Sequence, residues 1–476
     1  MLSLRFFKTG ILLLAAMLTA STAAARTFSV MVYNVENLFD DDGVAAYDDY
    51  QPNLYTSAHF KTKLANISRV VGSMEEGRGP DIILFQEIEV DQTPDRVDSA
   101  ENQLLAALKA RGMTGYTVVS GSDSARDQYE DGKPRAVKCV VFTRFPVRKV
   151  RNHATLNARN ILEVELEIDG ARLHVFDNHW KSGAGDPEME KIRIANARTL
   201  RSRLDGILRN DPHADIILGG DFNSQYNQSR VMKGRMPITA LNGVLGSQGN
   251  ELAIRGGKAD LYNLWFELPP AERGSDVYHG EWGTLIQMIL SRGLYDFKGV
   301  QYVDNSFAVL RLKGINATPE GTPLRWSSEG KAGFGFSDHF PVYALFRTVK
   351  DDRPDKWMKL ENPSTSDDSP SQPPKAPEKI YDLTTAIRLS DVADQAALRS
   401  GSFNGKLMEV EGRIGKGRRL SVEVKGNIWE VWVPDPALRE KLRSQWREGE
   451  SVSFFGILGQ FKGTWQFTIE RADWIR

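Results

Sequence analysis

Residues 215–224 read DIILGGDFNS: branched apolar residues run into Gly219 and Gly220, and Asp221 and Asn223 follow at once. A short apolar run bounded by glycine is typical of a buried strand. Glycine lets the backbone turn sharply and approach a neighbour closely, which would aim Asp221 into the space beyond the strand. Taken alone, an aspartate and an asparagine at a strand end are explained by turn formation. Further clusters of polar residues at the ends of other strands would be needed to indicate a functional site.

Four further clusters of polar residues flank apolar, strand-like runs. Together with the first they include two histidines, several carboxylates and carboxamides, and a lysine, a mixture that turns alone do not require. Side chains at strand ends can converge on one edge of a layered fold, so we expect one shared site. The four clusters are Asn34, Glu36 and Asn37; Gln86 and Glu87; Asp177, Asn178, His179, Lys181 and Ser182; and Ser337, Asp338 and His339.

The sequence from residue 27 to residue 348 indicates an α/β body. The stretches ENQLLAALKA and IRIANARTLRSRLDGILR have a helical period of apolar residues. Strands that are apolar on both faces, mixed with such helices, indicate sheets that are covered by helices. The runs that read as strands are FSVMVYNV, DIILFQEI, AVKCVVFTRF, ILEVELEI, ARLHVFDN, DIILGGDF and FPVYALFR.

Residues 1–25 have the pattern of a signal peptide. Basic residues precede an apolar stretch at residues 10–20, and Ala23 with Ala25 fits the small-residue cleavage rule. That stretch is shorter than the ~20 residues that span a bilayer, so we expect cleavage before Arg26 and no stable membrane anchor, with a retained anchor helix as the alternative. The mature chain is expected in the periplasm or secreted. Its single cysteine, Cys139, excludes an intrachain disulfide.

A length of 476 residues predicts two to three domains, and composition divides the mature chain into three parts. The α/β body is expected at residues 26–350. Residues 351–379 are rich in proline, serine and charge, which predicts a disordered linker. Residues 380–476 contain about five short alternating strands, with one helix between the third and the fourth. This pattern is typical of a small oligonucleotide-binding (OB-like) barrel.

The predicted barrel carries aromatic residues and a basic turn. Aromatic platforms beside basic residues hold single-stranded nucleic acid in such barrels, but the same alternation also fits a barrel core, and both interpretations stay open. The net charge of −1 gives no whole-chain attraction to nucleic acid. The residues concerned are Trp429, Trp432, Phe461 and Trp465, with Lys416, Arg418 and Arg419.

The chemistry of the five clusters points to phosphate ester hydrolysis. Carboxylate and carboxamide oxygens suit Mg²⁺, or Mn²⁺ as an alternative, whereas the short ligand spacings of zinc sites are absent from the sequence. No G-x-S-x-G or phosphate-binding Walker motif is present. Histidines beside carboxyl groups can serve as base and acid. A lysine and a divalent metal ion would stabilise charge on phosphate oxygens.

The strings YNVENLFD, FQEIE, DNHWKS, GGDFNS and FSDHFPVY, in this order, resemble the endonuclease/exonuclease/phosphatase superfamily with its deoxyribonuclease I-like fold. The resemblance covers about residues 27–348, and HWKS within this set resembles secreted bacterial nucleases. It implies a four-layer α/β/β/α sandwich with two packed, mostly antiparallel sheets. The whole chain is therefore expected to be α/β, with the small OB-like β-barrel at its end.

The resemblance also implies a role for each matching residue. It implies that Glu87 is the principal metal ligand, with Asn34 and Asp338 assisting. Asp221 and Asn223 would orient the attacking water and the phosphate, and either Asp221 or His339 would take the proton. The remaining residues would contact the phosphate or the leaving group: His179 at the leaving oxygen, and Asn178, Lys181 and Ser182 at the phosphate.

One departure from the family pattern concerns the strand upstream of the SDH motif. Family members carry an aspartate there that orients the histidine, whereas GTLIQMILS places Ile286 at that position and Gln287 beside it. Without such a carboxylate, His339 would have a lower pKa and a less defined tautomer. Either Gln287 or another side chain replaces the acid, or turnover is slow.

Three functions are compatible with the sequence. The first is an exported, divalent-metal-dependent phosphodiesterase, a nuclease that hydrolyses DNA or RNA by in-line attack of an activated water. The second is a phosphoesterase of the same fold that acts on a lipid head group or a small phosphorylated molecule. The third is a non-catalytic nucleic-acid-binding protein, which the missing aspartate favours and the otherwise intact set of site residues opposes.

Overall fold

The structure is a computed structural model that describes residues 26–93, 98–124, 127–130, 132–365, 374–377, 381–393, 397–399, 403–417, 419–461 and 464–476. The predicted signal peptide at residues 1–25 lies outside these residues. Within the described ranges, no helix combines the length and the apolar character needed to cross a membrane.

Two β-sheets form the centre of the body. The first, a 7-stranded sheet, has the order β14(Val300–Tyr302), β16(Val342–Thr348), β1(Thr27–Leu38), β2(Ile82–Glu89), β4(Val137–Thr143) and β3(Thr117–Ser120), with β15(Ala308–Val309) also pairing with β16. The second, a 6-stranded sheet, has the order β5(Val147–His153), β6(Ile161–Ile168), β7(Ala171–His179), β8(Asp215–Asp221), β12(Ile286–Ser291) and β9(Leu261–Asn263). Only the β1–β2 and β7–β8 pairs are parallel in these sheets as described.

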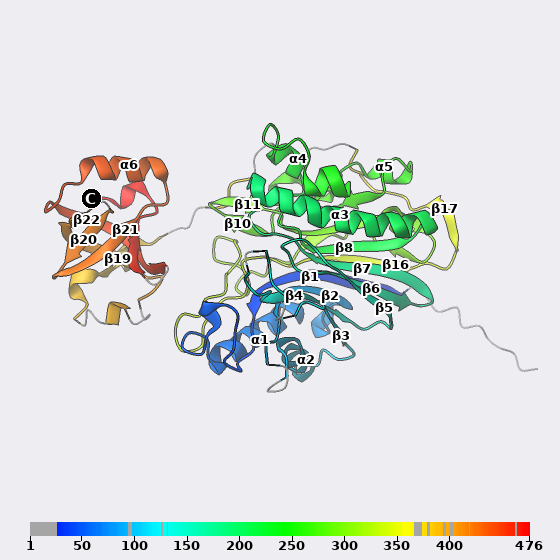
Figure 1. The fold of residues 1–476 in the computed structure, drawn as a ribbon, viewed down its shortest axis with the longest axis horizontal. Helices are drawn as coiled ribbons and strands as arrows, with labels where there is room; N and C mark the ends of the chain where they lie inside the picture. Colours follow the sequence, from blue (N-terminus) through cyan, green and yellow to red (C-terminus); the bar gives the residue numbers. More distant parts are fainter. Residues whose placement is uncertain are drawn as a thin grey trace, which may run out of the picture.

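Helices cover the outer face of each sheet. Helices α1(Ser57–Val71) and α2(Ala100–Ala110) pack against the first sheet, and α3(Pro187–Asn210) packs against the second (Figure 1). The two sheets pack face to face through an apolar core that includes Val32, Leu84 and Ile217. The predicted four-layer α/β/β/α sandwich is therefore confirmed.

The helix starts follow from local sequence. Helix α3 begins with Pro187, whose missing N–H would have no partner at this position, and the Asp186 side chain accepts a hydrogen bond from the Glu188 N–H at 2.8 Å. Helix α1 begins after Thr56, which forms a reciprocal cap with His59. The sequence analysis did not identify α1. Shorter elements between the two sheets' strands include α4(Gln228–Val231), α5(Glu251–Arg255), and the hairpin of β10(Asp276–Tyr278) and β11(Glu281–Gly283).

Within the segment expected to be a disordered linker, residues 351–379, the structure describes residues 351–365 and 374–377, and these contribute structure to the body. Strand β17(Arg353–Trp357) pairs with β13(Asp296–Phe297). It does so because Trp357 and Met358 are apolar side chains that pack onto the core of the body. Farther along, residues 374–376 pair with β11: the N–H of Trp282 donates to the Pro374 carbonyl at 2.8 Å. The high content of proline, serine and charged residues in this segment gave no indication that Trp357 and Met358 pack onto the body.

The C-terminal unit is a closed barrel. Its strands follow the order β18(Ile387–Arg388), β19(Leu407–Ile414), β20(Ser421–Val424), β21(Asn427–Trp432), β23(Thr464–Thr468) and β22(Ser451–Phe461), and pairing of β19 with β22 closes it. Helix α6(Pro436–Gln445) lies in sequence between β21 and β22, as predicted for an OB-like fold (Figure 1). The predicted small barrel is therefore confirmed.

The aromatic residues of the barrel divide between core and surface. Trp429, expected among the exposed candidates, is only 1% exposed and belongs to the barrel core, because its β21 position faces inward. Trp432 is 43% exposed, with the Arg439 guanidinium 4.5 Å from its ring centre. Arg418 and the side chain of Phe461 lie outside the described part of the chain. Trp465 is partly buried against the barrel core, so the aromatic surface candidate that remains is Trp432.

Candidate active site

The strand ends that carry the polar clusters meet at one edge of the sandwich. Strands β1 and β2 are parallel neighbours in one sheet, and β7 and β8 are parallel neighbours in the other, so each pair ends at a common edge. Because the sheets pack face to face, the two edges lie together around a cavity of about 600 Å³. The expected site residues that line it are Glu87, His179, Ser182, Asp221, Asn223, Asp338 and His339.

Local backbone irregularities turn these side chains into the cavity. Glu87 and Asn223 have φ values of 66° and 47°, in the left-handed region that ordinary residues seldom adopt. Glu87 lies within a register shift between Phe85 and Ile88, which interrupts the pairing of β2 with β4. Strained backbone of this kind is concentrated at functional sites. Its presence at two expected site residues supports the assignment of this edge as the site.

The two glycines of DIILGGDFNS allow close approach on both sides of β8. A Cβ at Gly219 would lie 2.8 Å from side-chain carbons of Leu84 and Val32 in the opposite sheet. A Cβ at Gly220, whose φ is +137°, would lie 2.0 Å from the Asn178 carbonyl oxygen on β7. Larger residues would separate these layers and displace Asp221. The glycines therefore place the carboxylate at the cavity.

Asn34 holds two carboxylates from opposite sheets. Its Nδ2 donates to Glu87 Oε1 at 3.0 Å and to Asp221 Oδ2 at 3.1 Å, while its Oδ1 accepts from the Glu36 N–H at 2.9 Å. Asp221 is fixed further because its Oδ1 accepts from the Asn223 N–H at 2.8 Å. In this arrangement Asn34 presents its amide nitrogen to the centre of the site. Its contribution here is to position Glu87 and Asp221.

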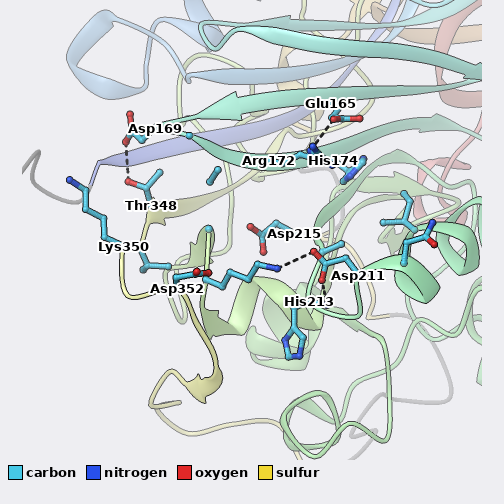
Figure 2. A pocket seen from close by; sticks show the side chains of 18 of the residues that line it. Glu165, Asp169, Arg172, His174, Asp211, His213, Asp215, Thr348, Lys350 and Asp352 are labelled. Atoms are coloured by element: carbon cyan, nitrogen blue, oxygen red, sulfur yellow. Dashed lines mark hydrogen bonds and ion pairs between the residues drawn. The ribbon is translucent and has the colours of Figure 1, made fainter.

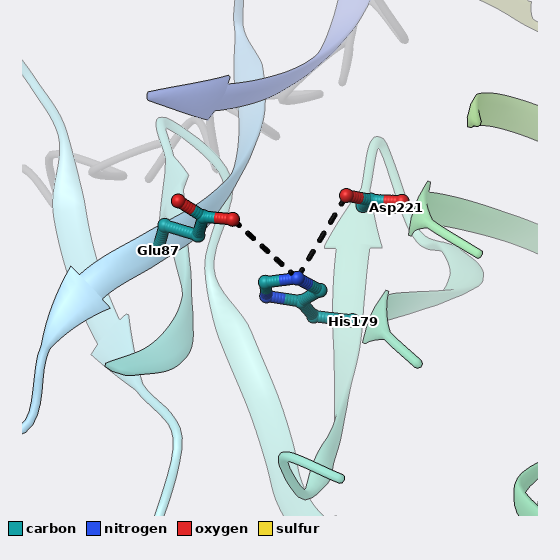
Figure 3. Close-up of side chains that lie close together, drawn as sticks. All are labelled: Glu87, His179 and Asp221. Carbon is teal, nitrogen blue, oxygen red and sulfur yellow. Dashed lines mark ion pairs between the residues drawn. The ribbon is translucent and has the colours of Figure 1, made fainter. Parts of the chain in front are cut away.

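Glu87, His179 and Asp221 line the cavity, and their side chains lie close together (Figure 3). The Nε2 of His179 lies 3.6 Å from Glu87 Oε1 and 3.7 Å from Asp221 Oδ2. One ligand atom from each of the three residues lies within 4.8 Å of the others, a spacing suited to a metal ion. Burial, together with the repulsive charge of Arg159, lowers the pKa of His179 well below its usual value. The neutral imidazole that results can bind a metal or donate a hydrogen bond.

The donor set fits a divalent cation. Burial, together with the neighbouring carboxylate of Asp338, raises the pKa of Glu87 to about 7, which is the expected effect of crowded carboxylates that lack a cation. Asp338 Oδ1 is buried and has no hydrogen-bond partner. Two or three carboxylate oxygens in a partly open cavity match the preference of Mg²⁺ and Mn²⁺. The residues present are therefore compatible with the metal implied by the sequence.

His339 enters the cavity from the segment before β16. Its Nε2 lies 3.6 Å from Asp338 Oδ1 and 3.8 Å from Asp221 Oδ2. Burial alone would lower the pKa of His339, but the carboxylates of Asp338, Asp221 and Asp276 contribute to raising it to about 9. The surrounding carboxylates therefore favour the protonated form of the imidazole, which is the opposite of the lower pKa expected from the missing acid. A protonated His339 is suited to donate a hydrogen bond to an anionic substrate.

Two residues of the site were missed by the sequence analysis. Arg159 lines the cavity, and its guanidinium interacts electrostatically with Glu87 and Asp221. Asp276 also lines the cavity, with Oδ1 3.9 Å from Nδ1 of His339. Neither residue ends one of the apolar runs that revealed the other clusters. A search for charged residues next to short, irregular strands would have included both.

Asn178 and Lys181, which were expected to contact phosphate, are not among the residues that line the cavity. Asn178 is fully buried on β7, where its Nδ2 donates to the Gly219 carbonyl at 3.1 Å and its Oδ1 accepts from Trp180 Nε1 at 3.2 Å. Alternation along β7 places its side chain with Phe176 and Trp180, which pack under α3. Its amide therefore links β7 to Gly219 on β8 and to the Trp180 side chain.

The endonuclease/exonuclease/phosphatase family model matches residues 29–348, which contain every residue that lines this cavity. The chain belongs to this family. No curated protein matches the chain in sequence.

Solved structures similar to this family member include three that differ in source. TDP2 from C. elegans is 16% identical, and the match covers 67% of this chain and 75% of that chain with a TM-score of 0.39. An endonuclease/exonuclease/phosphatase from Beutenbergia cavernae is 15% identical over 68% of this chain and 72% of that chain, with a TM-score of 0.43. D. rerio TDP2 complexed with single strand DNA product is 16% identical over 67% and 98%, with a TM-score of 0.38.

A second cavity, of about 720 Å³, lies at the other end of this family member's sheets (Figure 2). Its walls include Asp215 at the start of β8 and Thr348 at the end of β16. Charges of both signs alternate there: Lys298 pairs with Asp211 at 3.1 Å, and Arg172 pairs with Glu165 at 3.1 Å. None of the five sequence clusters contributes to its walls. The chemistry expected of the family therefore belongs to the first cavity.

Proposed function

We propose that this chain is an exported, divalent-metal-dependent phosphodiesterase that hydrolyses nucleic acid. One observation carries the proposal: Glu87, Asp221, Asp338 and two histidines from separate segments converge on one cavity. Membership of the endonuclease/exonuclease/phosphatase family gives the reaction class. The nucleic-acid substrate is supported by the OB-like barrel, a fold that commonly binds oligonucleotides.

Mg²⁺, with Mn²⁺ as the alternative, would be held by Glu87, with Asp221 and His179 within reach. Asp338, whose charge raises the pKa of Glu87, would assist. Bound there, it would supply positive charge to the phosphate oxygens as negative charge builds up on them. The buried, unpartnered Oδ1 of Asp338 supports its inclusion in the ligand set.

Side chains of the cavity would bind the phosphate and accept the proton of the attacking water. Arg159 and protonated His339 donate hydrogen bonds to phosphate oxygens, and so orient the phosphodiester. With His339 donating to the phosphate, Asp221 is the group that accepts the proton of the attacking water. The Asn223 N–H fixes the Asp221 carboxylate for this step, with the N–H donating to Oδ1 at 2.8 Å.

His179 completes the in-line displacement on the leaving-group side. Its pKa lies well below the usual value because of burial, so the ring is neutral before reaction. A neutral ring donates a hydrogen bond to the leaving oxygen as its bond to phosphorus breaks, and that oxygen then takes a proton from solvent water. Ser182, on the cavity wall, is placed to contact a phosphate oxygen beside it.

The export part of the proposal rests on the composition of residues 1–25. Thr27 begins β1 and Phe28 is already buried, so cleavage before Arg26 would leave the fold intact. Edman sequencing of protein from a periplasmic or culture fraction should give Arg26 as the first residue. A chain that retains residues 1–25 in the membrane fraction would contradict export.

The activity is tested with mature protein, supercoiled plasmid DNA and Mg²⁺. We expect cleavage that EDTA abolishes and that Asp221→Asn lowers by at least about 10²-fold, the usual contribution of a general base. Asp260→Asn is the matched control, because Asp260 is exposed and lies outside the cavity. Single-stranded DNA, RNA, phosphatidylcholine vesicles and 4-nitrophenyl phosphate serve as parallel substrates.

The outcomes separate the candidate functions. Hydrolysis of vesicle lipid or of the small ester, without any nucleic-acid cleavage, would transfer the same chemistry to another substrate class. Folded protein that binds DNA but cleaves none of these substrates would contradict a catalytic function. Equal activity of Asp221→Asn and wild-type protein would contradict the proposed site.

A further inference from the structure

The family pattern places an acid on β12 to orient the site histidine, and this chain lacks that acid. Ile286 occupies the position and is fully buried in the core between the sheets. Gln287 is also buried, but both ends of its amide are engaged: Nε2 donates to the Ser224 carbonyl at 2.6 Å, and Oε1 accepts from Asn263 Nδ2 at 2.7 Å. Gln287 therefore supports the loop after Asp221. The orientation of the His339 ring must be fixed by another residue.

Asp276 faces the ring nitrogen that the reaction does not use. The two nitrogens of His339 lie in different surroundings: Nε2 lies near Asp221 and Asp338, whereas Nδ1 lies 3.9 Å from Asp276 Oδ1. Nδ1 is buried and has no hydrogen-bond partner. The backbones of Asp276 and His339 also form an isolated β-bridge, which fixes the two residues side by side.

The carboxylate of Asp276 is held from three directions. Its Oδ1 accepts from Ser275 Oγ at 2.9 Å and from the Leu285 N–H at 3.1 Å. Its Oδ2 lies against Gly283, the residue opposite Asp276 in the β10–β11 hairpin, where a Cβ would be only 2.0 Å from that oxygen. The Phe340 N–H donates to the Ser275 carbonyl at 2.6 Å and joins this hairpin to the His339 segment. The carboxylate is therefore preorganised beside the ring.

We propose that Asp276 is the positioning residue of His339, supplied by the β10–β11 hairpin in place of the acid missing from β12. This inference rests on the proposed function. Asp276 accepts a hydrogen bond from Nδ1–H, which fixes the ring orientation and leaves Nε2 directed at the substrate. The separation of 3.9 Å closes to hydrogen-bond length when substrate fills the cavity, because catalytic hydrogen bonds are often long in the free enzyme.

The first test is Asp276→Asn, with His279→Asn as the control on the exposed turn of the same hairpin. Loss of a carboxylate behind a functional histidine costs about 10- to 100-fold. We expect Asp276→Asn to lower kcat by that factor with little change in KM, and His279→Asn to leave both unchanged. Adding Ile286→Asp to Asp276→Asn restores an acid at the family position and should recover part of the lost kcat.

The second test needs no enzymatic activity. In ¹⁵N-histidine-labelled protein, with the His339 signals assigned by comparison with His339→Asn, we expect a slowly exchanging Nδ1–H in wild type and its loss in Asp276→Asn. Gly283→Ala, which keeps the carboxylate but displaces it, should have the same effect. A wild-type ring without a protonated Nδ1 would overturn the proposal even if Asp276→Asn failed to fold.

These readouts separate the two proposals. If wild type cleaves DNA but Asp276→Asn retains full kcat and the same ring signals, the positioning role is wrong and the nuclease stands. If no substrate is cleaved, the ring signals still decide whether Asp276 orients His339.

Discussion

Glu190 and Arg193, one turn apart on α3, form a salt bridge that is completely closed to solvent. Arg193 NH2 lies 2.8 Å from Glu190 Oε2, and both side chains have 0% exposure. The same guanidinium donates to the carbonyls of Lys181 at 3.0 Å and Gly183 at 3.1 Å. Residues 182–185 line the active-site cavity. The buried pair therefore connects the stability of α3 to the shape of the site.

Replacement of Glu190 by alanine should destabilise the protein strongly. It leaves the positive charge of Arg193 buried without its carboxylate, which costs about 3–5 kcal/mol. Urea denaturation should show this loss, and assays of the proposed nuclease activity should show a raised KM because residues 182–185 lose their anchor. Glu188→Ala is the matched control: Glu188 pairs with Lys191 at 2.6 Å on the exposed face of the same helix, where a pair contributes less than about 1 kcal/mol. Equal losses in the two variants would contradict this assignment.

Replacing Gly219 by alanine should lower the stability of the protein, whereas the same replacement at Gly206 should raise it. A Cβ at Gly219 would lie 2.8 Å from Val32 and Leu84, and overpacking of this kind costs about 1–3 kcal/mol. Gly206 lies within α3 with no atom within 4 Å of an added Cβ, so Gly206→Ala should stabilise by roughly 0.5–1 kcal/mol. Midpoints of urea denaturation measure both. A neutral Gly219→Ala would mean that the sheets are less tightly packed there.

The sequence predicted those parts of the site that depend on local patterns. Asp221 and Glu87 follow apolar runs, and the position of a polar residue at a strand end is visible without the fold. Asn178 shows the limit of this reasoning. It belongs to a cluster, but the alternation along β7 turns its side chain towards α3, beside Trp180. Because successive side chains of a strand point to opposite faces of the sheet, strict use of this alternation would have placed Asn178 and His179 on different faces.

Asp276 and Arg159 could not be identified from local sequence. Asp276 reaches the site because it pairs with His339, a residue more than 60 positions later in the sequence. Arg159 lies between β5 and β6 and enters the cavity through the packing of the two sheets. In both cases a long-range contact, and not a periodic pattern, decides where the residue lies. The pairing of β17 in the predicted linker also depends on a long-range contact, because Trp357 packs against the core of the body.

Stability should fall as the pH rises through 7 because of a carboxylate cluster distant from the active site. Glu251 lies close to Glu267 and Asp304, and burial followed by the charge of Asp304 raises the pKa of Glu251 from 4.5 to about 7. Between these two values the folded state binds a proton that the unfolded state has released. The contribution of Glu251 is therefore present below pH 4.5 and lost on passing through pH 7, by on the order of 1–3 kcal/mol.

Denaturation midpoints between pH 5 and pH 8 test this pH dependence. Glu251→Gln should flatten the profile, because the amide cannot lose a proton. Glu272→Gln, at an exposed position nearby in the sequence, is the control and should keep the wild-type slope. An unchanged slope in Glu251→Gln would exclude Glu251 as the titrating group.

The barrel should unfold independently of the body when its core is damaged. Trp429 packs with Phe467 and other residues of a core that shares no member with the cores of the body. Trp429→Ala should cost the barrel about 3–5 kcal/mol, as large-to-small changes of buried aromatic residues do. Differential scanning calorimetry should show a barrel transition at lower temperature and an unchanged transition of the body. Trp432→Ala, at the exposed end of the same strand, should shift neither transition appreciably. A joint shift of both transitions in Trp429→Ala would mean that the barrel and the body unfold as one cooperative unit.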